Sequence, residues 1–96
     1  MKSYYVYIIT NYTNSVLYIG ITNDIVRRVY QHKTGAAKSS FSKRYKLYKL
    51  VWFEEFGSVT DAIASEKAIK KWRREKKIAL IKSINSNFRD LLSDGV

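Results

Sequence analysis

Two strand-forming segments lie close together at the start of this chain, and they constrain its fold more than any other feature. Residues 4 to 9 and residues 16 to 21 are both rich in aromatic and β-branched side chains. Only a short connection around the polar residues 11 to 14 separates them, so they are expected to pair as an antiparallel hairpin. With the turn centred in that segment, Tyr7 would lie directly opposite Tyr18, whereas a slip of one residue would place the two on opposite faces.

A helix with two functional side chains on one face is expected directly after the hairpin. Residues 22 to 24 supply the polar and acidic side chains typical of a helix start, and Gly35 follows the expected end. The helix should therefore span about residues 24 to 34. Arg28 and His32 are four residues apart, so they share one face and predict a phosphate-sized site. A solvated helix face is the alternative.

The remainder of the chain predicts a third strand and further helices. A polar, basic loop is expected over residues 35 to 46, followed by a strand over residues 47 to 56. Residues 58 to 61 match a capping box and should open the second helix. We expect a break near residues 74 to 76, and then a third helix that reaches Ile84.

This order of elements, β-β-α-β-α with one further helix, defines the expected fold class. It predicts an α+β protein in which a small three-stranded antiparallel sheet is flanked by helices. Residues 1 to 85 are expected to form a single domain, since the 96-residue chain contains no proline and no linker-like segment. For residues 86 to 96 we expect a partly frayed tail, with docking of Phe88, Leu91 and Leu92 on the core as the alternative.

Composition narrows both the chemistry and the partner. The chain has no Cys and one His, which excludes disulfides, thiolate zinc sites and multi-histidine sites. Any metal would be held mainly by oxygen, which favours Mg²⁺ or Mn²⁺. The formal net charge of +10 predicts a polyanionic partner, with nucleic acid ahead of an anionic membrane surface. The chain lacks an apolar run of about 20 residues and the layout of a signal peptide, so we expect a cytoplasmic protein without a membrane span.

The basic side chains cluster in two segments that would bind nucleic acid. The first segment is the predicted loop with its edges, and the second lies on and after the second helix. Charge runs are often only solvated faces, but the Ser-rich loop and its aromatic residues favour phosphate contacts and base stacking. The residues selected for this role are Lys33, Lys38, Lys43, Arg44 and Lys46 in the first segment, and Lys70, Lys71, Arg73 and Arg74 in the second.

Two further positions indicate a functional site. Glu66 falls within an apolar stripe of the second helix formed by Val59, Ile63 and Ile69, which predicts an inward-facing carboxylate that is paired or holds a metal. A partner such as Arg28, or a stripe rotated enough to expose the carboxylate, is the alternative. Gly20 within a strand favours the close approach of a ligand such as nucleic acid, although a turn or bulge explains it equally well.

Taken together, these residues resemble the GIY-YIG nuclease superfamily over roughly residues 4 to 77, and they are most similar to its small, single-domain bacterial branch. The first motif is present as Tyr5-Val6-Tyr7, without the Gly of the family name. The second motif is intact as Tyr18-Ile19-Gly20. The helical residues of the family correspond to Arg28, His32 and Glu66.

The resemblance implies a metal-dependent endonuclease that hydrolyses nucleic-acid phosphodiester bonds, DNA above all, with one Mg²⁺ or Mn²⁺ ion. It implies Tyr7 as the general base and Tyr18 as the residue that assists or positions it. Arg28 would stabilise negative charge in the transition state, and His32 would orient a group or shuttle a proton. Glu66 would hold the metal ion.

Two departures from the family leave alternatives open. Asn85 is the nearest candidate for a late Asn that helps the site in the family, although it lies far from Glu66 in sequence. Many family nucleases carry a separate DNA-binding domain, and none is expected here. This favours branched, damaged or single-stranded substrates, as in repair or recombination, or a protein partner that supplies specificity. We expect a monomer or a weak dimer. The alternative function is a non-catalytic nucleic-acid-binding module of the same fold.

Overall fold

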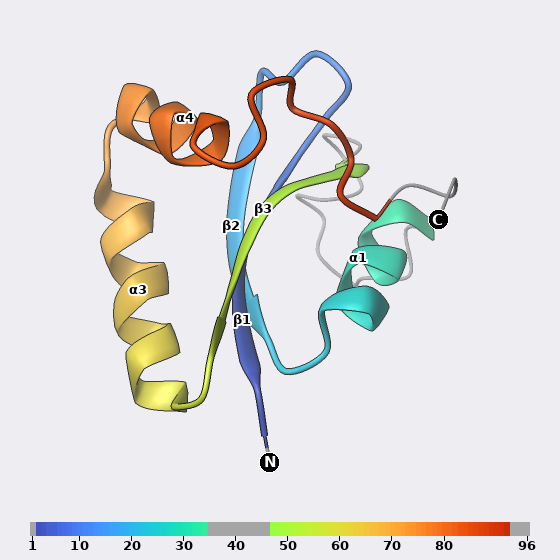
Figure 1. Cartoon of the computed structure of the whole chain (residues 1–96). Coiled ribbons are helices and arrows are strands. Elements are labelled where there is room, and N and C mark those ends of the chain that lie inside the picture. Colours follow the sequence, from blue (N-terminus) through green and yellow to red (C-terminus); the bar gives the residue numbers. More distant parts are fainter. Residues whose placement is uncertain (1, 35–46, 93–96) are drawn as a thin grey trace.

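The computed structural model describes residues 2–34 and 47–92, which contain one three-stranded sheet (Figure 1). The strands are β1 (Tyr4–Thr10), β2 (Leu17–Thr22) and β3 (Lys49–Phe56). They lie in the order β2-β1-β3, and both neighbouring pairs are antiparallel. The third strand begins two residues later than predicted, but the predicted sheet is confirmed.

Helices cover both faces of this sheet. Helix α1 (Ile25–Thr34) lies on one face, whereas α3 (Val59–Lys71) and α4 (Arg74–Lys82) lie on the other (Figure 1). The predicted α+β class and order of elements are therefore confirmed. No helix within the described ranges is long and apolar enough to cross a membrane.

The register of the hairpin differs from the predicted one by two residues. Tyr7 lies opposite Gly20, and Tyr18 lies opposite Ile9, so Tyr7 and Tyr18 are not direct partners. A shift of two residues keeps every side chain on its original face, because side chains alternate along a strand. Both tyrosines therefore still point to the α1 side of the sheet.

An asparagine-centred loop sets this register. The side-chain oxygen of Asn11 accepts hydrogen bonds from the backbone N–H groups of Ser15 and Val16 at 2.9 and 3.3 Å. Asn14 has a φ of 57°, in the left-handed region that Asn tolerates better than most residues. These local bonds favour a wider connection than the tight turn that the polar segment suggested.

Side-chain caps fix the starts of the two main helices. Asp24 precedes α1, and its Oδ1 accepts a hydrogen bond from the backbone N–H of Arg27 at 3.1 Å. The helix therefore begins at Ile25, one residue later than predicted. Ser58 caps α3, because its Oγ accepts a hydrogen bond from the backbone N–H of Asp61 at 3.4 Å.

The chain bends between α3 and α4 at Trp72 and Arg73, where the backbone is extended with ψ angles of 152° and 157°. The break therefore precedes its predicted position at residues 74 to 76. Neither Gly nor Pro marks this bend, so the sequence carries little local signal for it. Lys76 Nζ lies 4.2 Å from the ring centroid of Trp72, a cation–π contact that stabilises the bend.

The core consists of one cluster on each face of the sheet. The apolar side chains on the α1 face surround the middle of β1, whereas those on the α3 face join the sheet to α3, α4 and the tail. The buried members on the α1 face are Tyr7, Ile9, Val29, Leu47 and Leu50. Those on the other face are Val6, Ile8, Ile19, Val51, Trp52, Ala62, Ile69, Ile81 and Phe88.

The C-terminal tail is docked rather than frayed as far as Leu92, which corresponds to the alternative that the sequence left open. The backbone N–H of Leu91 donates to the carbonyl of Leu50 at 2.8 Å. The Asp90 carboxylate accepts hydrogen bonds from the backbone N–H of Leu50 at 3.2 Å and from Lys33 Nζ at 2.5 Å. These bonds satisfy the edge of β3 and tie the tail to α1. Residues 93–96 lie outside the described part of the chain.

Candidate active site

The hydroxyl group of Tyr7 lies at the centre of a polar cluster between β1 and α1. Tyr7 is 1% exposed. Arg28 Nε donates a hydrogen bond to the hydroxyl oxygen at 3.3 Å, and Nε2 of His32 lies 3.3 Å from the same oxygen. Arg28 and His32 come from one face of α1, as their spacing predicted. The fold thus brings three of the predicted catalytic residues into contact.

The missing side chain at Gly20 makes room for the Tyr7 ring. The two residues lie opposite each other in the sheet, and a Cβ atom at position 20 would lie 2.5 Å from Cζ of Tyr7. A larger residue would therefore push the phenol away from Arg28. This steric role explains the glycine in the strand, and its role towards nucleic acid stays a prediction.

Tyr18 lies beside the cluster, diagonal to Tyr7. Its ring centroid lies 6.4 Å from that of Tyr7 and 5.3 Å from that of His32. Its hydroxyl is also a hydrogen-bond partner of Arg28 and helps to raise the pKa of that guanidinium. Arg28 therefore links both tyrosines of the sequence motifs.

Burial and the charge of Arg28 set the protonation of the cluster. Burial raises the pKa of Tyr7 above its ordinary value, and the hydrogen bond from Arg28 offsets this only in part. Burial, followed by repulsion from Arg28, lowers the pKa of His32 to about 4. At neutral pH, Tyr7 is therefore a phenol and His32 is a neutral imidazole. When the ring proton of His32 is on Nδ1, Nε2 accepts the hydrogen bond that Tyr7 donates.

Glu66 lies on the side of α3 that faces the sheet, although the stripe that predicted it is rotated. Ala62 and Ile69 are buried, whereas Val59 and Ile63 are 44% and 39% exposed. The inward face of α3 therefore runs from Ala62 past Glu66 to Ile69. The prediction placed Ile63 on the inward face instead of its neighbour Ala62, because alanine is only weakly hydrophobic and Ile63 is the larger apolar residue.

The Glu66 carboxylate pairs with Lys70, one helical turn along α3, and not with Arg28, which the sequence offered as the alternative partner. The ion pair is 2.8 Å long, with side-chain exposures of 13% for Glu66 and 52% for Lys70. The negative charge of Glu66 also contributes to the raised pKa of Tyr7. The carboxylate thus lies within electrostatic range of Tyr7, although Glu66 comes from α3 and the Tyr7 side chain points to the opposite, α1 side of the sheet.

The residues around Glu66 fit a magnesium-type ion only as a one-carboxylate site. Within the described ranges, no group of three or more Asp, Glu, His or Cys side chains is placed to hold a metal. Mg²⁺ often binds through one or two carboxylates, with water and substrate phosphate as its remaining ligands. Glu66 suits this pattern if a metal ion displaces Lys70.

Three predicted nucleic-acid-binding residues have partners within the protein. Lys33 binds the tail, Lys70 pairs with the α3 carboxylate, and Arg74 Nη2 donates to the carbonyl of Asn14 at 2.5 Å. Their positive charges are therefore partly committed to holding the fold. Of the others, Lys71 and Arg73 are exposed, and Lys38, Lys43, Arg44 and Lys46 lie outside the described residues.

Asn85 supports the C-terminal chain. Its side-chain nitrogen donates to the carbonyls of Val51 and Arg89 at 3.0 and 2.7 Å, and its side-chain oxygen accepts from the backbone N–H of Arg89 at 2.9 Å. These bonds account for its burial without any ligand. None of them leads to the tyrosine cluster, so the structure does not bring Asn85 together with the other predicted site residues.

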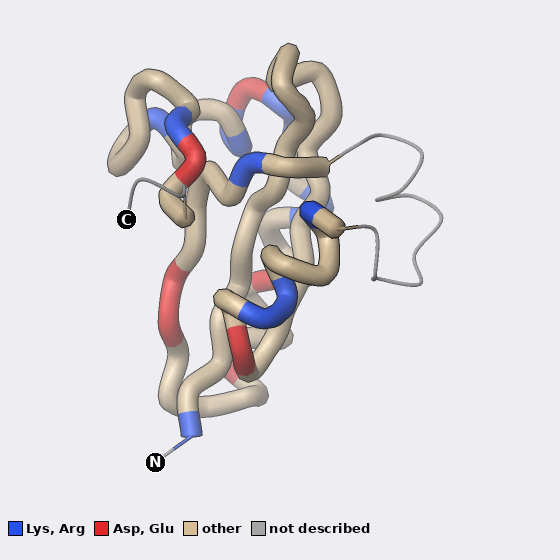
Figure 2. The backbone as a smooth tube through the Cα atoms, turned by 90° about the vertical axis from the view of Figure 1, so that its right-hand side faces the viewer, with Lys and Arg blue, Asp and Glu red and all other residues tan. Residues whose placement is uncertain are grey.

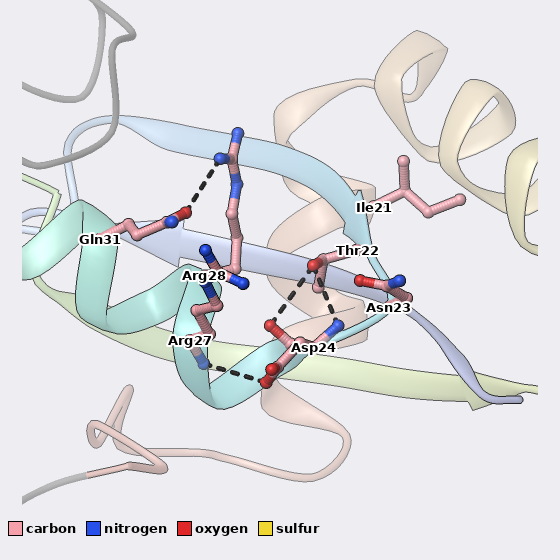
Figure 3. A pocket seen from close by; sticks show the side chains of 7 residues that line it. All are labelled: Ile21, Thr22, Asn23, Asp24, Arg27, Arg28 and Gln31. Carbon is pink, nitrogen blue, oxygen red and sulfur yellow. Dashed lines mark hydrogen bonds between the residues drawn. The ribbon is translucent and has the colours of Figure 1, made fainter.

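An open pocket of about 570 Å³ adjoins Arg28 where β2 runs into α1 (Figure 3). Arg28 forms one wall, and its Nη1 donates a hydrogen bond to Oε1 of Gln31 at 3.3 Å. The same guanidinium therefore faces both the pocket and Tyr7. The lining residues are Ile21, Thr22, Asn23, Asp24, Arg27, Arg28 and Gln31. The sequence prediction missed Gln31, although its position three residues after Arg28 was an available signal.

The α1 side of the molecule carries both basic and acidic positions, as the view in Figure 2 shows. Helix α1 itself contains Arg27, Arg28 and Lys33 and no acidic residue, and Asp24 immediately precedes it. The helix is therefore a positively charged element beside the tyrosine cluster, as expected for a surface that meets phosphate groups.

One class of protein combines all the site residues described above. It has a motif tyrosine on each of the first two strands, an Arg and a His on the following helix, and a Glu on a later helix. The sequence matches the GIY-YIG catalytic domain over residues 3–79. The chain therefore belongs to the GIY-YIG family. Proteins with this domain are generally endonucleases, which supports nuclease activity and nucleic-acid binding for this chain.

Within this class, the chain is similar to proteins named UPF0213. A relative from Limosilactobacillus reuteri is 38% identical over 78 residues, which cover 79% of each chain. One from Syntrophus aciditrophicus is 34% identical over 82 residues, covering 85% of this chain and 93% of the relative. The solution NMR structure of a UPF0213 protein from Bacillus halodurans has 27% identity and a TM-score of 0.58, with 92% of both chains covered. The fold is therefore shared along almost the whole chain.

Proposed function

We propose that this protein is an endonuclease that hydrolyses nucleic-acid phosphodiester bonds, with DNA as the favoured substrate. One observation carries the proposal: the Tyr7 hydroxyl is held between Arg28 Nε and His32 Nε2, at 3.3 Å from each. A buried phenol with a cationic donor on one side and a neutral acceptor on the other is suited to proton transfer beside a phosphate. Membership of the GIY-YIG family supports the same activity.

Tyr7 and His32 together would activate the attacking water. Since the pKa of Tyr7 is raised, the residue enters the reaction as a phenol and not as a phenolate. The water proton would move to the Tyr7 oxygen while the phenol proton passes to Nε2 of His32. The negative charge of a bound phosphate would oppose the effect of Arg28 and make both groups more basic. Proton acceptance is therefore coupled to substrate binding.

Arg28 would bind the phosphate and stabilise the charge that develops on it. Its Nε is directed to Tyr7, and its terminal nitrogens face the adjoining pocket and Gln31. A preorganised guanidinium stabilises negative charge without reorganising during the reaction. Tyr18 would position the water or the phosphate, since it contacts the same guanidinium.

Glu66 would hold one Mg²⁺ or Mn²⁺ ion. Such an ion would supply positive charge to the phosphate and to the departing oxygen. The chain's own contribution is to keep a partly buried carboxylate within electrostatic range of Tyr7, with Lys70 as its counter-ion until the metal binds. Lys70 is half exposed, so once a metal ion displaces it from Glu66 its ammonium group would contact the phosphate backbone.

We further propose that the substrates are branched, flapped or single-stranded forms of the kind that arise in repair and recombination. The small domain offers little surface for reading a long duplex sequence, so a partner protein would supply additional specificity. We expect the free protein to be a monomer or a weak dimer, which light scattering after size-exclusion chromatography would establish.

The experiment that tests the proposal is a cleavage assay on supercoiled, single-stranded, flapped and junction DNA and on RNA, with Mg²⁺, Mn²⁺ or EDTA. Wild type should cut at least one substrate, and Arg28→Ala and Glu66→Ala should each lose about 100-fold or more. Val26→Ala is the matched control, since Val26 is 62% exposed on the same helix as Arg28. Binding without cleavage by all four proteins would instead assign the non-catalytic binding module.

A further inference from the structure

The charged side chains that line the pocket beside Arg28 favour a ligand with a single negative charge. Arg27 and Arg28 contribute two positive charges, and Asp24 contributes one negative charge. The net charge of the lining is therefore +1, which matches a single phosphodiester and not a polyphosphate or a bare metal ion. The Asp24 carboxylate would repel a second phosphate placed directly beside the first.

The rest of the lining is suited to a neutral, hydrogen-bonding group. Asn23 and Gln31 present amide groups, whereas the Thr22 hydroxyl is bonded to the backbone of Asp24 and the Ile21 side chain packs against the core on the α3 face (Figure 3). A sugar with its base offers donors and acceptors that match these amide groups. The volume of about 570 Å³ falls in the range of pockets that hold small molecules of nucleotide size.

Arg28 connects this pocket to the tyrosine cluster. Its Nη1 is held by Gln31 at the pocket wall, whereas its Nε is held by Tyr7. Gln31 therefore holds the guanidinium in the orientation in which it contacts both the pocket and Tyr7. A phosphate bound by Arg28 would lie between the pocket and the tyrosine cluster. The group inside the pocket would therefore be the nucleoside attached to that phosphate.

We infer that this pocket is a subsite for one nucleotide unit, in which Arg27 and Arg28 bind the phosphate and Asn23, Asp24 and Gln31 bind the attached nucleoside. The inference rests on the proposed function for its place beside the scissile phosphate. Binding to the pocket, however, does not require cleavage. The shared ligand chemistry is a nucleoside monophosphate group, either as part of a nucleic-acid strand or as a free nucleotide.

The test is a titration of the ¹⁵N-labelled protein in EDTA, followed by amide chemical shifts. The probes are thymidine 5′-monophosphate, thymidine, inorganic phosphate and a single-stranded oligothymidylate. The monophosphate should shift the amides of residues 21–31 and bind at least tenfold more tightly than thymidine or phosphate alone. Tighter binding of the oligothymidylate than of the monophosphate identifies a strand subsite, and equal binding identifies a site for free nucleotides.

Two variants probe the pocket, and one controls for charge. Arg27→Gln and Gln31→Leu should each weaken monophosphate binding by about five- to tenfold. Lys82→Gln removes the same charge from an exposed position on α4, across the sheet, and should leave it unchanged. Equal weakening by Arg27→Gln and Lys82→Gln, or shifts that avoid residues 21–31, would overturn the subsite.

The outcome is separable from that of the cleavage assay. If wild type binds the monophosphate in the pocket but cuts nothing, the subsite stands and the nuclease proposal fails. If wild type cuts DNA but Arg27→Gln and Gln31→Leu bind the monophosphate as wild type does, the nuclease stands and the subsite fails.

Discussion

Nε2 of His32 lies 3.3 Å from the hydroxyl of Tyr7, although 25 residues separate the two in the chain. His32 is 3% exposed on α1, and Tyr7 is 1% exposed on the central strand. The pair therefore joins the helix to the sheet through a buried contact. The protonation of this pair matters both for the stability of the fold and for the proposed chemistry.

The low pKa of His32 predicts that the protein loses stability in mild acid. The pKa is about 4 in the folded protein, against 6.5 for an ordinary histidine, so the unfolded chain binds more protons between these values. The contribution of His32 to stability is complete above pH 6.5 and is lost as the pH falls towards 4, by at most about 3 kcal/mol. Urea unfolding at several pH values between 7.5 and 4.5 measures it.

The control for this prediction is His32→Gln, which cannot take up a proton in this range. Its free energy of unfolding should depend less on pH than that of wild type between pH 6.5 and 4.5. If both proteins lose stability with the same slope, another group is responsible for the acid sensitivity.

Replacing Gly20 by alanine should displace Tyr7. The new Cβ would lie 2.5 Å from Cζ of Tyr7, so either the ring or the strand must move. We expect a loss of about 1 to 3 kcal/mol in the free energy of unfolding, together with weaker cleavage. Gly57→Ala is the matched control, because no atom lies within 4 Å of a Cβ at that position. A Gly20→Ala protein as stable as Gly57→Ala would contradict the steric role.

Tyr7→Phe should leave the fold intact and remove the proton-transfer group. The variant keeps the buried ring, but Arg28 Nε and His32 Nε2 lose their shared partner. Cleavage should fall by about 100- to 10,000-fold, the usual range for loss of a general acid–base group. Tyr12→Phe provides the comparison, since Tyr12 is 74% exposed and should tolerate the change. Equal activity of the two variants would exclude Tyr7 from the chemistry.

Lys70→Gln should strengthen metal binding. The substitution removes the cation that pairs with Glu66 at 2.8 Å, so a metal ion no longer has to displace it. We expect the dissociation constant for Mn²⁺, measured by electron paramagnetic resonance without DNA, to fall several-fold. Lys71→Gln removes a neighbouring exposed charge and should have a smaller effect. Unchanged Mn²⁺ binding in Glu66→Gln would show that this carboxylate does not hold the metal.

Asp90→Asn should loosen the tail and the end of α1 together. The carboxylate accepts hydrogen bonds from Lys33 and from the backbone N–H of Leu50, and both weaken when its charge is removed. Lys33 and Asp90 are only partly buried, with side-chain exposures of 26% and 19%, so we expect a loss of about 1 kcal/mol. Amide hydrogen exchange should quicken at Leu91. The exposed Glu54→Gln on β3 should leave this exchange rate as in wild type.

The elements of the fold could be predicted from the sequence because their signals are local. The aromatic and β-branched composition of β1 and β2, the polar start and the i,i+4 pair of α1, and the cap at Ser58 each depend on residues a few positions apart. These local signals were sufficient to predict the sheet and the order of the helices. Predictions that fall on residues 35–46 lie outside the described part of the chain.

The candidate site could be predicted only as a set of residues. The spacing of Arg28 and His32 placed them on one face of the helix. No short-range pattern indicated that both side chains would contact the Tyr7 hydroxyl, or that Gly20 would leave the space for the Tyr7 ring. The shift of the hairpin by two residues came from side-chain bonds of Asn11 within the loop. Strand register depends on such bonds and on packing across the sheet, which short-range patterns do not record.

By itself, the sequence determined the strands, the helices and the kind of side chains available, because local backbone preferences and side-chain periodicity are properties of neighbouring residues. Only the tertiary structure decided which of these side chains meet and in what protonation state. Burial raises the pKa of Tyr7 and lowers that of His32 because the packing of α1 on the sheet removes both side chains from water. The docked tail likewise follows from Asp90 reaching Lys33, 57 residues away, and no local pattern contains that contact.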